Sequence, residues 1–134
     1  MKTLVLRFGS AASAAVLALA ALAAAPAPMH VRLTKSEPMA DSTVVAAPTE
    51  IKLWFSAPVQ VPVTTVRVSA VDGTSQATIP VRASSGSNAP LVAALPRPLT
   101  NGRYSVAWRT MSRDGHVISG TFAFTVAAPA PTGN

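Results

Sequence analysis

The side chains in this sequence best suited to binding a metal ion are two histidines and one aspartate. His30 and His116 are the only histidines, and Asp114 lies two residues before His116. Residues two apart in extended backbone project to one side, and Gly115 between them lets the chain bend and bring the pair closer. Imidazole nitrogen with carboxylate oxygen suits copper(II) in tetragonal geometry. His30, Asp114 and His116 are therefore candidate metal ligands.

Simpler interpretations exist for each of these residues. Asp114-Gly115 by itself predicts a hairpin turn that His116 merely flanks, and a lone histidine such as His30 is usually a solvated surface residue. The chain contains no cysteine, which excludes disulfides, thiolate zinc sites and thiol nucleophiles. Zinc accepts the same nitrogen and oxygen donors but usually takes a shell of four ligands. Two histidines alone do not establish a metal site.

The N-terminal residues have the pattern of a secretory signal peptide. Met1 to Arg7 is positively charged, Phe8 to Leu22 is apolar and uncharged, and Ala21-Leu22-Ala23 gives the small-x-small cleavage pattern. We expect residues 1–23 to be a cleaved signal peptide, followed by a short extension over 24–29, and the protein to be exported. An uncleaved anchor is the alternative, but the apolar part is short for a span of roughly 20 residues.

The position of cleavage decides what His30 can offer a metal. Cleavage after Ala23 leaves six residues before His30, so the free α-amino group does not belong to the histidine. A histidine at the mature N-terminus would chelate through both its amine and its imidazole, which favours copper(II) strongly. Further trimming would restore that amine. The sequence leaves both ligand sets open.

After residue 30 the sequence predicts an all-β domain. Short apolar or alternating runs are separated by turn signals such as Asp72-Gly73 and Asn101-Gly102. The predicted strands are 30–36, 51–55, 63–70, 77–83, 91–95, a long strand around 104–108 and a final strand around 122–126. About seven short strands favour a Greek-key antiparallel β-sandwich, Ig-like or cupredoxin-like. The aromatic residues expected in its core are Trp54, Phe55, Trp108, Phe122 and Phe124.

The charge distribution argues against nucleic acid as a partner. The formal net charge is +6, but Lys2 and Arg7 lie in the predicted leader. The other nine basic residues (11 minus 2) are spread singly, with no basic run interleaved with aromatic residues. Scattered charges of this kind are typical of a solvated surface.

Two stretches of the chain resemble a known family. The C-terminal stretch closely resembles the signature of the CopC family of bacterial copper-resistance proteins, through Tyr104-x-Val106-x-Trp108-Arg109-x-x-Ser112-x-Asp114-Gly115-His116-x-x-Ser119-Gly120-x-Phe122-x-Phe124-x-Val126. The N-terminal stretch is similar through His30-Val31-x-Leu33-x-x-Ser36-x-Pro38 and Pro48-x-x-Ile51-x-Leu53-x-Phe55-Ser56. Order and spacing agree from His30 to Val126.

The resemblance implies a copper-binding β-sandwich over residues 30–127. Pro129, Pro131 and Gly133 predict a disordered tail over 128–134. The resemblance also implies a monomeric periplasmic protein that carries or buffers copper(II) without catalysis, with His30 (imidazole and amine), Asp114 and His116 as ligands. An inner-membrane copper transporter of the CopD type is the implied partner. Some members add a methionine-rich loop for copper(I), whereas residues 56–100 here contain no methionine. Many members also have an acidic residue where this chain has Ala57.

Two other functions fit parts of the sequence. A copper-histidine centre also occurs in enzymes that cleave polysaccharides oxidatively, but this short chain offers no flat aromatic face for such a substrate. A metal-free Ig-like interaction module, docking on an envelope copper transporter or another partner, becomes the main alternative to copper binding if the amine ligand is absent.

Overall fold

The computed structural model describes residues 30–73 and 75–129. The chain divides into two units, Met1–His30 and Val31–Asn134. The predicted signal peptide over 1–23, the extension over 24–29 and most of the predicted tail lie outside the described residues. Within the described residues, no helix has the length and apolar character needed to cross a membrane.

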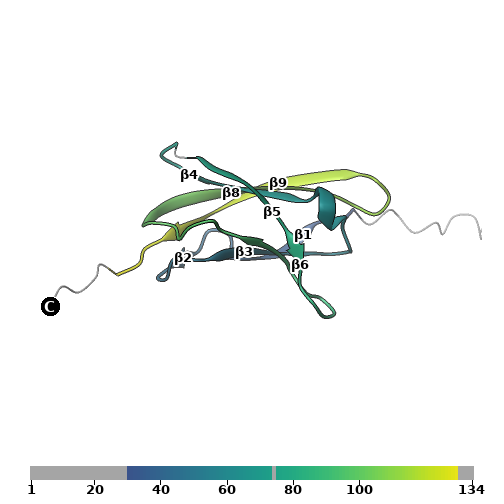
Figure 1. Cartoon of the computed structure of the whole chain (residues 1–134), viewed down its shortest axis with the longest axis horizontal. Coiled ribbons are helices and arrows are strands. Elements are labelled where there is room, and N and C mark those ends of the chain that lie inside the picture. The colour runs from purple at the N-terminus through teal and green to yellow at the C-terminus, as the bar shows by residue number, and fades with distance from the viewer. Residues whose placement is uncertain (1–29, 74, 130–134) are drawn as a thin grey trace, which may run out of the picture. The chain divides into compact units, whose positions relative to one another are not determined.

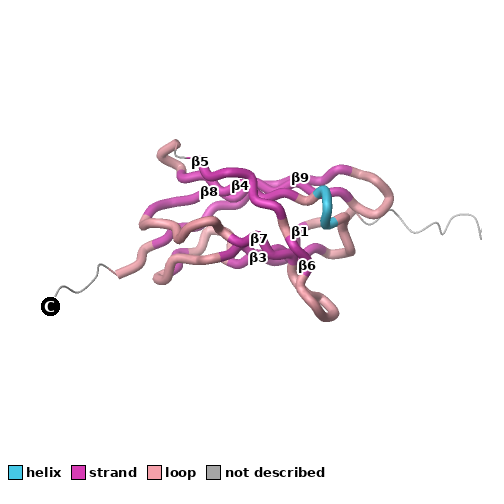
Figure 2. The backbone as a smooth tube through the Cα atoms, in the orientation of Figure 1, coloured by secondary structure: helices cyan, strands magenta, loops and turns pink. Residues whose placement is uncertain are grey.

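The second unit consists of two β-sheets that lie one above the other (Figure 1). The four-stranded sheet has the order β1 (Leu33–Glu37), β3 (Glu50–Phe55), β7 (Leu91–Ala94) and β6 (Arg82–Ala83). The five-stranded sheet has the order β2 (Thr43–Val44), β9 (Val117–Val126), β8 (Gly102–Met111), β4 (Thr65–Ala70) and β5 (Ser75–Pro80). Figure 2 shows one short helical turn, η2 (Val61–Val63), before β4.

This architecture confirms the predicted β-sandwich and corrects its details. The chain crosses repeatedly between the sheets, as a Greek-key sandwich requires. The single strand predicted over 77–83 is two strands, because β5 ends at Pro80, which has no N–H for the ladder, and β6 begins in the other sheet. Asp41-Ser42-Thr43 has the residue types of a turn, yet Thr43 begins β2, whose Val44 pairs in parallel with Val126 of β9. The sheet is therefore not purely antiparallel.

The core lies between the sheets and follows the period of two. Alternate residues of each strand are buried, as in Ile51 and Leu53 of β3 and Tyr104 and Val106 of β8. Of the predicted core aromatics, Trp108 and Phe124 are buried, and Phe55 and Phe122 pack against the core while partly exposed.

The prediction that Trp54 lies in the core is wrong. The inward direction of Leu53 and Phe55 sends Trp54 to the outer face of the sheet, where it is half-buried. The ammonium group of Lys35 lies 4.3 Å from the centre of its ring. Trp54 is thus a surface residue covered by a cation, and the core depends on the other aromatic residues.

Trp108 holds the two sheets together near one end of the sandwich. Its ring meets Phe55 of the other sheet edge to face, with centroids 5.2 Å apart and planes at 73°. On its own sheet Trp108 pairs with Gly120 of β9. A Cβ added to Gly120 would lie 2.5 Å from Cζ2 and 2.8 Å from Cε2 of the indole. The indole therefore needs glycine beside it.

We expect Gly120→Ala to destabilise the fold by about 1–3 kcal/mol, because the indole must leave its rotamer or the strands must separate. Urea unfolding followed by circular dichroism measures this change. The control is Ser119→Ala, at the exposed neighbouring position of the same strand.

A second background tests the cause. In a Trp108→Phe protein the indole atoms nearest the added methyl group are gone, so Gly120→Ala should cost clearly less than in the natural sequence. An equal cost in both backgrounds would show that the steric explanation is wrong.

Candidate metal centre

The proposed ligands Asp114 and His116 lie in the turn of the longest hairpin in the described structure. Strands β8 and β9 pair in unbroken register from Gly102 with Val126 to Met111 with Val117. The turn is closed by Ser112 N–H bonded to the His116 carbonyl (2.9 Å) and Gly115 N–H bonded to the Ser112 carbonyl (3.0 Å). Gly115 has a φ of 89°, a left-handed conformation that glycine adopts without strain.

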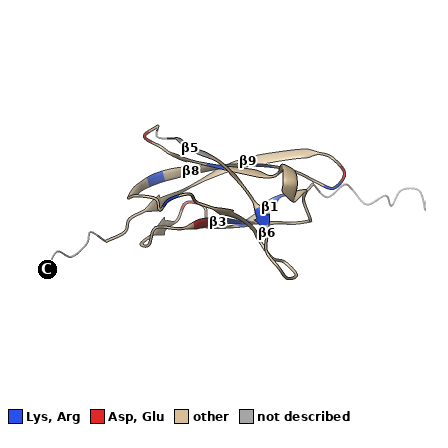
Figure 3. Cartoon of the chain, viewed as in Figure 1, with Lys and Arg blue, Asp and Glu red and all other residues tan. Residues whose placement is uncertain are grey.

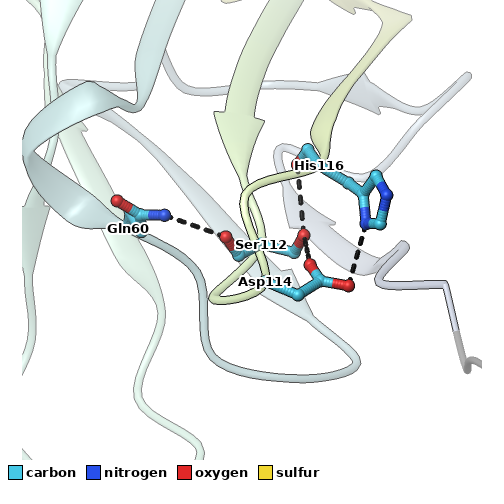
Figure 4. Close-up of polar contacts among 4 residues, drawn as sticks. All are labelled: Gln60, Ser112, Asp114 and His116. Atoms are coloured by element: carbon cyan, nitrogen blue, oxygen red, sulfur yellow. Dashed lines mark hydrogen bonds and ion pairs between the residues drawn. The ribbon is translucent and has the colours of Figure 1, made fainter.

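The turn brings the two side chains into direct contact (Figure 4). Nδ1 of His116 lies 2.8 Å from Oδ2 of Asp114. The Ser112 hydroxyl lies between the other carboxylate oxygen, Oδ1, and the His116 carbonyl, and it donates its hydrogen to the carboxylate. The sequence prediction that Asp114 and His116 share one side is confirmed, although a turn rather than extended backbone brings them together.

These contacts control the protonation of Asp114. The Ser112 hydroxyl, and secondly the His116 imidazole, stabilise the carboxylate and lower its pKa from 3.8 to about 2. Asp114 is therefore ionised at any physiological pH. Its hydrogen bond to His116 then requires a hydrogen on Nδ1, which leaves the lone pair of the neutral imidazole on Nε2.

The hairpin turn is hydrogen-bonded to Gln60, in the segment that precedes β4. Its side-chain amide donates to the Ser112 carbonyl (2.9 Å), and its backbone N–H donates to the Met111 carbonyl (2.8 Å). Thr64 donates to the Gln60 carbonyl (2.8 Å) and contacts Thr110 of β8 through paired hydroxyls (2.5 Å). Both threonines are buried. The hairpin turn that carries the candidate ligands therefore rests on an ordered polar network.

The pair itself is open to solvent, with 77% of the His116 side chain and 61% of the Asp114 side chain exposed. Two ligand atoms at right angles, each about 2.0 Å from one metal ion, are about 2.8 Å apart. That separation matches the distance between Nδ1 and Oδ2. The two donor atoms therefore lie close enough for one metal ion to contact both, once the hydrogen between them is displaced.

The same three residues are poorly arranged for nucleophilic catalysis. In a serine hydrolase triad the histidine lies between the serine and the carboxylate, where it takes the hydroxyl proton. Here the carboxylate of Asp114 lies between Ser112 and His116. The imidazole has no hydrogen bond to the hydroxyl and does not act as its base.

His30 is exposed and belongs to the first unit of the chain, so the geometry above concerns Asp114 and His116 alone. In the described part of the chain, no three or more acidic, histidine or cysteine side chains are grouped as metal ligands. Sequence reasoning missed Ser112 and Gln60. The spacing of Ser112, two residues before Asp114, could have indicated a shared side, but Gln60 is 52 residues from its partner and carries no local signal.

We expect Ser112→Ala to raise the pKa of Asp114 toward 3.8, because it removes the largest stabilising hydrogen bond. In the natural protein the folded pKa lies below the unfolded one. The carboxylate therefore contributes its full stability above about pH 4, and this contribution is lost as the pH falls through about 2. Carboxyl-carbon NMR titration of Asp114 checks both values. An unchanged titration in Ser112→Ala would contradict the assigned role of the hydroxyl.

Known proteins share both the sequence pattern and the fold. The CopC domain model matches residues 33–127. Copper resistance protein C of Escherichia coli is 35% identical over 103 residues, covering 72% of this chain and 81% of that protein. Protein YobA of Escherichia coli K12 is 31% identical over 97 residues, covering 72% and 78%.

Solved structures agree with these matches. The crystal structure of CopC from Methylosinus trichosporium OB3b superposes with a TM-score of 0.68 at 27% identity, covering 75% of this chain and 97% of that one. PcoC from Escherichia coli, described as a methionine-rich copper resistance protein, gives a TM-score of 0.61 at 32% identity, covering 73% and 99%. With a matching domain model over residues 33–127 and the same fold, the chain belongs to the CopC family.

Proposed function

We propose that this protein carries or buffers copper(II) in the bacterial periplasm, binding the ion through His30, Asp114 and His116. The observation that carries the proposal is the 2.8 Å separation of the imidazole nitrogen and carboxylate oxygen at the exposed hairpin turn. The names of its relatives, copper resistance protein C from several bacteria, support copper as the ion. The predicted signal peptide supports the periplasm.

His30 is proposed as the third ligand on the resemblance to the CopC family. Within the second unit, hydrogen bonds connect the segment that leads into β1 with Ser56. Arg32 and Ser56 exchange two hydrogen bonds, from Arg32 N–H to the Ser56 hydroxyl (3.0 Å) and from Ser56 N–H to the Arg32 carbonyl (2.9 Å). Three residues later Val59 forms a β-bridge with Ser112. The segment 56–59 thus connects the residues before β1 to the hairpin turn within the second unit.

The ligand types favour copper(II) over copper(I). The relative PcoC is described as methionine-rich, and thioether sulfur is a soft ligand suited to copper(I). Residues 56–100 of this chain contain no methionine. Nitrogen and oxygen donors at Asp114 and His116 match the harder, oxidised ion. We expect a monomer that exchanges copper(II) with an inner-membrane transporter of the CopD type.

Titration of the purified mature protein with copper(II), followed by tryptophan emission and EPR, tests the proposal. We expect one site, and we expect His116→Ala and Asp114→Asn each to weaken it by at least about 10-fold. His30→Ala should weaken it as well. The control is Asp41→Asn, an exposed carboxylate with a φ of 58° that asparagine tolerates equally.

The decisive comparison is with His116→Ala. If the natural protein binds copper(II) no more tightly than this variant, copper binding at the hairpin is wrong, and the interaction-module alternative takes its place. Intact-mass measurement of the exported protein, made on the same sample, establishes whether His30 has a free amine.

A further inference from the structure

The outer face of the five-stranded sheet has a shallow hollow of about 350 Å³ that contains two arginines and no carboxylate. The polar side chains that line it are Arg67, Arg109, Thr65, Thr78, Ser119 and Thr121. Its floor includes Ala107 and Gly120, which are small enough to leave the space open. The hollow therefore presents two guanidinium groups and four hydroxyls, with no acidic side chain lining it.

The strand register places the two arginines on neighbouring strands of the same sheet. Arg109 of β8 is directly opposite Thr65 of β4, and Ala107 is opposite Arg67. All four point outward, because the alternating neighbours on both strands are buried in the core. Arg67 and Arg109 are thus diagonal neighbours on one face, and such neighbours have Cα atoms about 7–8 Å apart across the two strands.

The arginines of this hollow lack the acidic partners that basic residues have on the other sheet. There, ion pairs join Lys35 to Glu37 (2.9 Å), Lys52 to Glu50 (3.2 Å) and Arg82 to Glu50 (3.6 Å). Figure 3 shows acidic and basic positions together on that sheet, at β1, β3 and β6.

Within the described residues, Arg67 reaches only the Thr78 hydroxyl, at 3.3 Å from Nη2. No hydrogen bond or ion pair joins the Arg109 side chain to any other described residue. Guanidinium groups are suited to carboxylates, which they bind through paired N–H donors. Among the residues that the structure describes, neither guanidinium group has an acidic partner, and only the Thr78 hydroxyl is bonded to one of them. The hollow therefore forms a surface complementary to negative charge.

We propose that this hollow binds an acidic segment of a partner protein in extended conformation, with carboxylates two residues apart. Side chains at positions i and i+2 of an extended chain are about 6.8 Å apart on one side, which matches the spacing of the two arginines. The proposal does not depend on copper binding, because none of the hollow's residues is a proposed ligand.

A linked pair of carboxylates fits the hollow better than a single small anion. The backbone groups of a sheet face are used in the ladder, so only side chains reach the ligand. A lone carboxylate on such an open surface stays largely hydrated, and one exposed ion pair contributes little. Two carboxylates on one chain engage both arginines together, and the second contact is intramolecular.

The test uses the metal-free mature protein and a capped five-residue peptide with glutamate at positions 2 and 4, followed by ¹⁵N NMR at low salt. Amide shifts should cluster at the hollow, around Thr65, Ala107 and Ser119. Arg67→Gln and Arg109→Gln should each weaken binding about 3- to 5-fold, and the double variant more. Raising the salt concentration should weaken binding further.

Matched controls separate this site from general charge attraction. A peptide with glutamine at both positions should not bind, and one with adjacent glutamates should bind more weakly. The control variant Arg82→Gln, on the opposite sheet, should leave the affinity unchanged.

Each contrary result overturns the proposal. One such result is amide shifts spread over the whole surface, and another is an equal loss of peptide affinity in Arg82→Gln. A third is inorganic phosphate binding as tightly as the peptide, which would show that the hollow takes an adventitious ion only. Shifts that depend on protein concentration without peptide would assign the face to a second copy of the chain.

Discussion

The unbroken ladder between β8 and β9 is the constraint on which the rest of this structure depends. Ten consecutive pairs fix every residue from Gly102 to Met111 against a partner between Val117 and Val126. A slip of one residue would exchange the inner and outer faces of both strands. The ladder thereby fixes the core aromatics, the outward arginines and the turn at its end. Its correct register depends on Trp108 meeting Gly120, since only glycine leaves space for the indole.

The candidate metal centre shows how a small, exposed site becomes ordered without being buried. His116 and Asp114 are largely in solvent, where side chains are normally mobile. Ser112, which is buried, bonds the carboxylate and is itself bonded through its carbonyl to Gln60. The exposed candidate ligands are thus positioned by neighbouring groups that packing against the core immobilises. Such support from neighbouring groups reduces the loss of side-chain freedom when an ion binds.

The two outer faces of the sandwich differ in how their charges are satisfied. On the four-stranded sheet, ion pairs neutralise charge locally, both within a strand, as between Lys35 and Glu37, and between strands, as between Arg82 and Glu50. Lys35 also covers Trp54. On the five-stranded sheet, hydroxyl-bearing and small residues separate the arginines, and the only described ion pair among the outward side chains of its β8 joins Arg103 to Asp41. The excess positive charge of the domain therefore lies in part on the sheet that carries the hairpin turn, and it is not evenly spread.

The sequence by itself determined the features that depend on neighbours along the chain. Alternation predicted most strands, Asp-Gly predicted the hairpin turns, and the spacing of Asp114 and His116 predicted their contact. Tertiary structure decided the rest. Strand β3 buries the face that carries Leu53, so Trp54 lies on the outside. Residues that look like a turn form β2, because they pair with the distant strand β9. The contact of Gln60 with Ser112, 52 residues later, exists only because η2 packs beneath the hairpin. Local sequence patterns encode the period of a strand and the position of a turn. Which distant strand or side chain a residue contacts depends on the packing of the whole domain, and a short segment carries no information about that packing.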